Sequence, residues 1–222
     1  MSSGAGRLRR FLRRNALSLV ALALMLGSLS GQFLTGRNVY NQERIELGLP
    51  PLDLRAYMTS GHAMSATFEN WESEFLQMGM FVMLTVVLRQ KGSAESRPMK
   101  KAEEHPRIEP GPVPWPVRAG GVWKVLYGHS LATAFFLLFA VSFLLHAEGS
   151  WRRELIERIG RHEPTIGFLA YLQSAPFWFE SFQNWQSEFL AVLSLVVLSI
   201  WLRQKDSPQS KPLSAPHSQT GT

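Results

Sequence analysis

Two glutamates within apolar stretches are the residues of this sequence best suited to chemistry. Glu74 and Glu188 each stand one helical turn after an asparagine, Asn70 or Asn184, at the start of a run of apolar residues. Residues four apart share a helix face. An ionisable side chain in a membrane segment is costly and usually faces a helix bundle or water, where it can bind a proton or a cation. The pattern therefore predicts a paired polar membrane site.

A simpler interpretation of the same glutamates is structural. At headgroup depth they would tie the helix entrance to an outer loop or to a neighbouring helix. Gln32 and His146 occupy equivalent positions at the outer ends of the preceding apolar segments. In two antiparallel hairpins we therefore expect Gln32 to meet Glu74, and His146 to meet Glu188. Both interpretations remain open on the sequence alone.

The glutamates belong to a motif that occurs twice. Asn-Trp-x-Ser-Glu-Phe-Leu stands at 70–76 and at 184–190, and each following apolar run closes on Leu-Arg-Gln-Lys, at 88–91 and 202–205. Tryptophan concentrates at membrane interfaces, and basic residues flank the cytoplasmic ends of spanning helices. The predicted interfacial anchors are Trp71, Trp185, Arg89, Lys91, Arg203 and Lys205.

The two motifs are part of a longer internal repeat. One offset relates both landmarks, since 184 − 70 = 114 and 203 − 89 = 114, and the same offset pairs Tyr57 with Tyr171 and Pro50 with Pro164. The sequence therefore predicts an internal duplication. The apolar segment at 16–34 would pass for a signal peptide, but its repeat partner lies mid-chain, so we expect a retained helix.

The predicted fold is an all-α membrane protein with four transmembrane helices. They form two tandem, parallel-repeat hairpins with amphipathic outer loops, because an even number of spans per repeat gives both copies the same orientation. We expect a basic cytoplasmic arm (1–14) before repeat 1 (15–91), which has spans at about 16–34 and 71–88 and an outer loop (35–70). A disordered Pro-rich cytoplasmic linker (92–121) leads to repeat 2 (122–205), which has spans at about 126–146 and 185–202 and an outer loop (147–184). A disordered tail (206–222) follows.

The outer loops have helical patterns of their own. The segments at 39–47 and 151–159 mix apolar and charged residues and end near glycine and proline, which predicts short amphipathic helices on the membrane interface. Ser60 and Ser174 are predicted to cap the long second helix of each repeat.

Composition narrows the functional classes. The chain has a net charge of +6, a pI near 10 and no cysteine, which excludes disulfides, thiol catalysis and thiolate metal sites. Of its 23 lysines and arginines, 16 fall on the predicted inner side and seven on the outer side. This asymmetry predicts that both termini are cytoplasmic. Because the basic residues lie beside apolar segments, we expect them to set the membrane orientation and not to bind nucleic acid.

No motif predicts an enzyme, a cofactor or a metal site. Phosphate loops, dinucleotide fingerprints and nucleophile signatures do not occur in the sequence. The histidines besides His146 lack the spacing of a helical metal pair. They are His62, His105, His129, His162 and His217.

The motifs also resemble a known family. With the twin Asn-Trp-x-Ser-Glu-Phe-Leu segments, the Leu-Arg-Gln-Lys endings and the Ser-x-x-Ser-(Arg/Lys)-Pro that follows them, the chain resembles small bacterial membrane proteins described only as a domain of unknown function. The resemblance covers nearly the whole chain except the linker. It implies a bacterial membrane location and gives no activity or catalytic residues to transfer.

The sequence therefore predicts a multi-pass protein of the inner cell membrane. We expect a non-enzymatic envelope protein with a structural or interaction role, in contact with the bilayer and with a second copy or another membrane protein. The alternative is a small ion- or proton-coupled transporter or channel that uses Glu74 and Glu188, for which dimerisation would help because four spans enclose little lumen.

Overall fold

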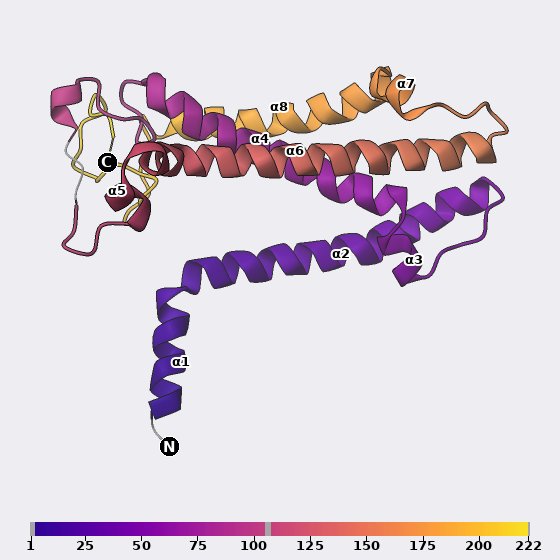
Figure 1. Ribbon diagram of the computed structural model, residues 1–222, viewed down its shortest axis with the longest axis horizontal. Helices are drawn as coiled ribbons and strands as arrows, with labels where there is room; N and C mark the ends of the chain where they lie inside the picture. The colour runs from indigo at the N-terminus through magenta and orange to yellow at the C-terminus, as the bar shows by residue number, and fades with distance from the viewer. Residues whose placement is uncertain (1–2, 105–107, 222) are drawn as a thin grey trace. The chain divides into compact units, whose positions relative to one another are not determined.

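The computed structural model describes residues 3–104 and 108–221, and within them the chain is helical, with no β-strand. The prediction of an all-α protein is confirmed. The α-helices are α1 (Ser3–Arg14), α2 (Ala16–Glu46), α3 (Leu54–Met58), α4 (Gly61–Val87), α5 (Trp115–Ala119), α6 (Gly121–Gly160), α7 (Phe168–Leu172) and α8 (Ala175–Leu198), with a 3-10 turn at Lys101–Glu103 (Figure 1). His105 lies outside the described residues.

The chain forms two compact units. The first unit combines Met1–Ser65 with Glu148–Gly167, and the second combines Ala66–Ala147 with Phe168–Thr222. Helices α4 and α6 contribute to both units, so the second unit contains most of α4, the first part of α6 and all of α7 and α8.

Helix boundaries recur at the offset seen in the sequence. Helices α4 and α8 begin at Gly61 and Ala175, α2 and α6 end at Glu46 and Gly160, and α3 and α7 also differ by 114 positions at both ends. Local hydrogen bonds recur as well. The hydroxyls of Ser73 and Ser187 each donate, over 2.8 Å, to the carbonyl three residues earlier. Such recurrence is what an internal duplication predicts.

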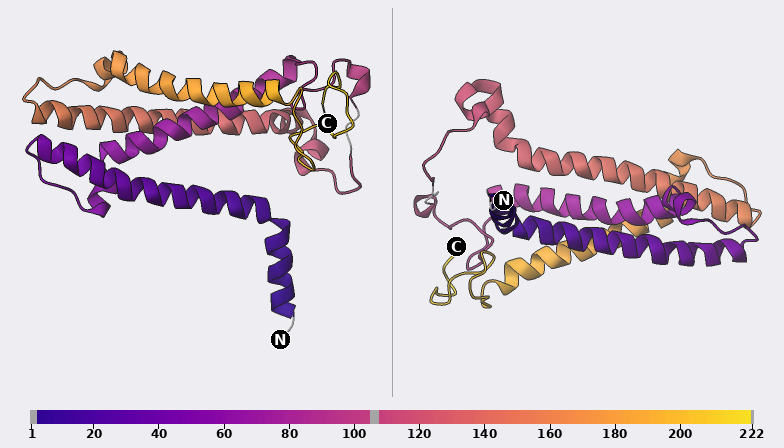
Figure 2. Two further views of the ribbon diagram at one scale, coloured as in Figure 1. Left: turned by 180° about the vertical axis from the view of Figure 1, so that it is seen from behind. Right: turned by 90° about the horizontal axis from the view of Figure 1, so that it is seen from below.

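Helices α2 and α6 are longer than the sequence patterns indicate. The amphipathic segments at 39–47 and 151–159 are not separate interfacial helices, because α2 and α6 run through them without a break (Figure 2). No proline interrupts either helix between its apolar and amphipathic parts. At a rise of about 1.5 Å per residue, the 40 residues of α6 extend about 60 Å, well beyond a membrane's hydrocarbon core.

The core of the first unit forms where the chain turns back on α2. Tyr40 from α2 and Tyr57 from α3 are buried beside Ala63 at the start of α4. The side chain of Asn41 donates to the carbonyl of Leu52 over 2.9 Å and accepts from its N–H over 2.7 Å. These two bonds hold the returning segment against α2.

Two glycines allow α4 and α6 to touch within the first unit. A Cβ on Gly61 would lie 2.6 Å from the carbonyl oxygen of Gly149, and a Cβ on Gly149 would lie 2.5 Å from the backbone nitrogen of Ser65. Side chains of any size are excluded at both positions. The close approach fixes the start of α4 against α6 just beyond the residues of the second unit.

The second unit packs α4, α6 and α8 through aromatic and small residues. Phe143 and Phe177 place their rings 5.6 Å apart between α6 and α8, and a Cβ on Gly79 of α4 would lie 3.3 Å from the ring of Phe136. Phe177 is fully buried. These contacts bring α4, α6 and α8 together.

The tail after α8 makes hydrogen bonds with the end of the second unit. Lys211 is 1% exposed, and its ammonium group donates to the carbonyls of Gly92, His217 (3.0 Å) and Gln219 (2.9 Å). Three carbonyls match the three N–H donors of a lysine. One buried lysine therefore folds the tail onto the end of the second unit, a role that a Ser- and Pro-rich composition does not reveal.

Two of the helices are long and apolar enough to cross a membrane, namely α2 and α6. In the most apolar 18-residue stretch of α2, no residue is buried, and in the corresponding stretch of α6, 22% of the residues are buried. The sequence predicts four spans, but α4 and α8 are not among the helices that qualify. In α4 the polar run from Asn70 to Gln77 shortens the purely apolar part.

Candidate functional site

The most enclosed polar site of the second unit is a pair of fully buried ionisable side chains. His146 on α6 and Glu72 on α4 are both 0% exposed, and His146 Nδ1 lies 3.1 Å from Glu72 Oε2. An ionised carboxylate can only accept a hydrogen bond, so Nδ1 carries the hydrogen. The indole of Trp185 on α8 donates to the other oxygen, Oε1, over 3.2 Å. Glu72 thus receives two N–H groups from two different helices.

Two further carboxylates lie on the other side of the imidazole. His146 Nε2 is 3.5 Å from Glu180 Oε2, but the geometry gives Nε2 no hydrogen-bond partner. One ligand atom each from Glu69, His146 and Glu180 lies within 4.8 Å of the others. The amide of Asn184 donates to Glu69. We call Glu69, Glu72, His146 and Glu180 the imidazole–carboxylate cluster.

Helix geometry explains how these residues meet. Glu69 and Glu72 are three apart and share one face of α4, while Glu180 and Asn184 are four apart and share one face of α8. His146 lies on α6 between them. Three carboxylates around one imidazole form a site of excess negative charge, which can hold a proton on Nε2 or a cation. These are therefore the residues able to hold a metal.

Glu74 and Glu188, the glutamates of the predicted membrane site, lie close together in the second unit. Their side chains are within hydrogen-bonding reach of each other, and the amide of Gln77 donates to the backbone carbonyl of Glu188 over 3.1 Å. The expected contact between His146 and Glu188 is replaced, because His146 contacts Glu72 and Glu180. Glu188 lies about two turns beyond Glu180 along α8.

The other predicted polar residues divide between the two units. Asn184 joins the cluster, whereas Asn70 donates to the carbonyl of Ala66 on its own helix over 2.8 Å. Gln32 is half-buried on α2, in the first unit.

The predicted interfacial anchors have several roles. The Trp71 ring packs edge-on against Phe68, with centroids 5.4 Å apart, whereas Trp185 belongs to the cluster's surroundings. Arg89 donates to the carbonyls of Thr85 and Val86 in α4 and of Leu88 just after it, and Arg203 donates to three carbonyls of the chain that follows α8. These arginines therefore cap helix ends. Lys91 and Lys205 are exposed.

Sequence reasoning missed Glu69, Glu72 and Glu180, and a usable signal was present. The glutamates it selected, Glu74 and Glu188, recur in both repeats, whereas the cluster consists of residues that differ between them. At the offset of 114, the cluster residues Glu69, Glu72, His146 and Glu180 correspond to Gln183, Gln186, Gln32 and Ala66. Each repeat contributes two ionisable residues opposite neutral ones in the other repeat, and this divergence marks a site that occurs once per chain.

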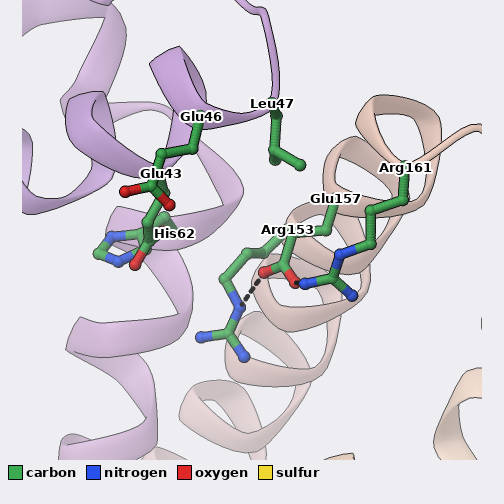
Figure 3. A pocket seen from close by; sticks show the side chains of 7 residues that line it. All are labelled: Glu43, Glu46, Leu47, His62, Arg153, Glu157 and Arg161. Carbon is green, nitrogen blue, oxygen red and sulfur yellow. Dashed lines mark hydrogen bonds and ion pairs between the residues drawn. The ribbon is translucent and has the colours of Figure 1, made fainter.

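The first unit contains a separate polar cavity of about 400 Å³ between the end of α2, the start of α4 and the end of α6 (Figure 3). Arg161 pairs with Glu157 over 3.2 Å, and Arg153 pairs with the same carboxylate over 3.6 Å. The residues that line the cavity are Glu43, Glu46, Leu47, His62, Arg153, Glu157 and Arg161.

His62 is held neutral in this cavity. Its ring stacks on Tyr40 with centroids 4.7 Å apart, and its Nδ1 lies 3.1 Å from the hydroxyl of Tyr57. Burial, followed by the positive charge of Arg153, lowers the pKa of His62 to about 4. Burial and the neighbouring Glu157 raise the pKa of Glu43. The cavity is thus adapted to a neutral imidazole near pH 7.

Comparison with known proteins gives one match. The model of a family described as "Domain of unknown function (DUF6766)" matches residues 8–222. No curated protein and no solved structure matches the chain.

The neutral His62 predicts acid sensitivity of the folded chain. Unfolded histidine takes up a proton near pH 6.5 but folded His62 only near pH 4, so its contribution to stability is complete above pH 6.5 and lost as the pH falls toward 4. Allowing for solvent screening, we expect a loss of roughly 1 kcal/mol, or about 2–4 °C in melting temperature, between pH 7.5 and 4.5. Thermal unfolding of the full chain in detergent measures it.

His62→Gln should remove this part of the acid-induced loss, because glutamine does not titrate. The matched control is His129→Gln, which changes an exposed histidine and should keep the wild-type pH dependence. An acid-induced loss of equal size in His62→Gln and the wild type would contradict the assignment. Glu43, whose pKa is raised, acts in the opposite direction and is present in all three proteins.

Proposed function

We propose that this chain, which belongs to the DUF6766 family, is a multi-pass membrane protein without enzymatic activity that acts in the cell envelope through interactions. The observation that carries the proposal is the exposure of long apolar helices. On α2, Leu17 is 86% exposed and Leu24 is 67% exposed, and on α6 Leu137 is 63% exposed. Apolar area left in water costs about 25 cal/mol per Å², whereas lipid solvates it.

We propose that α4 and α8 also cross the membrane, which makes four spans. Each has its polar residues in its first part and continues with apolar residues toward an arginine. Polar groups enter a bilayer only when they have partners. Glu72 and Gln77 on α4 are supplied with partners inside the second unit, which supports this placement.

The proposed topology puts both termini in the cytoplasm and the two repeats in the same orientation. The excess of lysine and arginine on one side supports it, as does the recurrence of helix boundaries 114 residues apart. The cluster then lies near the outer ends of the spans. The inner cell membrane is the location that fits this arrangement.

An interaction role is favoured by the aromatic start of α8. Trp178, Phe179 and Phe182 are 37%, 68% and 57% exposed, and the ring of Trp178 lies 5.5 Å from that of the buried Phe177. Exposed aromatic rings beside a spanning helix suit the membrane interface and also contacts with another membrane protein. A second copy of this chain or another membrane helix is the partner that such a surface fits.

A second candidate function, ion- or proton-coupled transport, is supported by the contact between Glu74 and Glu188. Two carboxyl groups within hydrogen-bonding reach can share one proton or bind one cation. They come from equivalent positions of the two repeats, as a site on a pseudo-twofold axis would require.

Reporter fusions test the membrane proposal. A reporter that is active only in the cytoplasm should work when fused after Lys91 or Lys205, and one active only outside should work after Leu49 or Thr165. The chain should also stay in the membrane fraction after alkaline carbonate extraction. Opposite locations for Lys91 and Lys205, or release of the chain by carbonate, would refute the four-span topology.

The double variant Glu74→Gln with Glu188→Gln separates the two functions. If the chain is an interaction protein, the double variant should form a complex of the same size as the wild type on native gels after extraction in mild detergent. The wild type should then show no proton or cation flux in liposomes. Wild-type flux that the double variant loses would establish transport instead. A complex no larger than the monomer would contradict the interaction role.

A further inference from the structure

His146 Nε2 is a buried ring nitrogen that lacks a hydrogen-bond partner in the described part of the chain. The whole side chain is 0% exposed, and Nε2 has no hydrogen bond, although Glu180 lies 3.5 Å away. Buried polar atoms without a partner are uncommon and costly, so each one calls for an explanation. Here Nδ1 faces Glu72, so Nε2 is the ring nitrogen that faces Glu180.

We propose that Glu69, His146 and Glu180 bind one divalent cation of the first transition row, such as Zn²⁺ or Mn²⁺. Their ligand atoms already lie within 4.8 Å of one another. Two ligand atoms that each lie about 2.0–2.2 Å from an ion are at most about twice that distance apart. Only a small rearrangement would therefore bring all three ligand atoms onto one ion. The proposal goes beyond the interaction function and does not depend on the membrane topology.

The surroundings of the three ligands resemble the outer shell of a metal site. A metal-binding histidine usually donates its second N–H to a carboxylate, which fixes the ring and its tautomer. Glu72 has that position, and it is itself fixed by the indole of Trp185 over 3.2 Å. The amide of Asn184 orients Glu69. Two ligands thus have their own orienting partner.

Charge and ligand type select the class of ion. Two ionised ligands, Glu69 and Glu180, balance the charge of one divalent cation, whereas without a cation three carboxylates would crowd one imidazole. Imidazole nitrogen suits zinc, iron, nickel and copper, while calcium and magnesium prefer shells made only of oxygen. The absence of cysteine from the sequence leaves this mixed nitrogen–oxygen set as the available chemistry.

The stoichiometry follows from the sequence. At the offset of 114, the positions equivalent to the three ligands hold Gln183, Gln32 and Ala66, and the position equivalent to Glu72 holds Gln186. None of these side chains is an ionisable ligand. We therefore expect one ion per chain.

Metal binding to the purified full chain tests the proposal. The chain in detergent is stripped with a chelator, titrated calorimetrically with Zn²⁺ and separately with Mn²⁺, and analysed for bound metal by mass spectrometry after dialysis. We expect one ion per chain, and a rise in melting temperature on addition of the metal. His146→Gln and Glu180→Gln should each weaken binding by at least about 100-fold, and Glu72→Gln by about 10–100-fold at unchanged stoichiometry.

The matched control is Glu148→Gln, which neutralises an exposed carboxylate two residues after His146 that pairs with Arg152 over 2.7 Å. It should bind metal as the wild type does. Helical content and melting of each metal-free variant show that it is folded, and Glu180→Gln serves if His146→Gln does not fold. No binding by the wild type, binding of Ca²⁺ or Mg²⁺ alone, or unweakened binding by His146→Gln or Glu180→Gln would overturn the proposal. In the first case the cluster holds only protons.

Discussion

The second unit depends on the contact between a buried imidazole and a buried carboxylate. His146 and Glu72 are withdrawn completely from solvent, and an isolated buried charge costs several kcal/mol. The folded state tolerates these two side chains because α4, α6 and α8 meet around them. The indole of Trp185 donates a hydrogen bond to the carboxylate of Glu72, and Glu180 faces the second ring nitrogen of His146. The polar contact therefore restricts how the three helices can slide along one another, which aromatic packing alone does not.

The two repeats contribute different residues to this contact. Where local geometry is shared, hydrogen bonds recur, as at Ser73 and Ser187. Where the copies diverge, each has two ionisable residues of the cluster at positions where the other has glutamine or alanine. Duplication thus supplies a symmetric framework of helices, and substitutions in both copies supply a single polar site. The pairing of Glu74 with Glu188 keeps the symmetric character and the cluster does not.

Much of the fold could be predicted from sequence, because local rules govern it. Ser60 accepts a hydrogen bond from the N–H of Ala63, as an N-cap should, and Gly48 takes a positive φ of 70° just after α2. In the second repeat His162 occupies the equivalent position with a φ of 58°. The unbroken course of α2 and α6 was missed because amphipathicity was taken to mark a separate helix.

The site was harder to predict, for a physical reason. Glu72, His146 and Glu180 come from three helices, and no spacing within one helix reveals that they converge. The contacts of Lys211 were hidden in the same way, since this residue looks like a solvated charge until its three carbonyl partners are known. Both features depend on contacts between distant segments.

A double-mutant cycle between His146→Asn and Glu72→Gln tests most directly whether this contact organises the second unit. The free energies of unfolding of the wild type, both single variants and the double variant would be measured in detergent at one pH. We expect a coupling energy of about 1.5–3 kcal/mol, the range for hydrogen bonds to charged groups. Effects that add within about 0.5 kcal/mol would show that the two residues act independently and would contradict it.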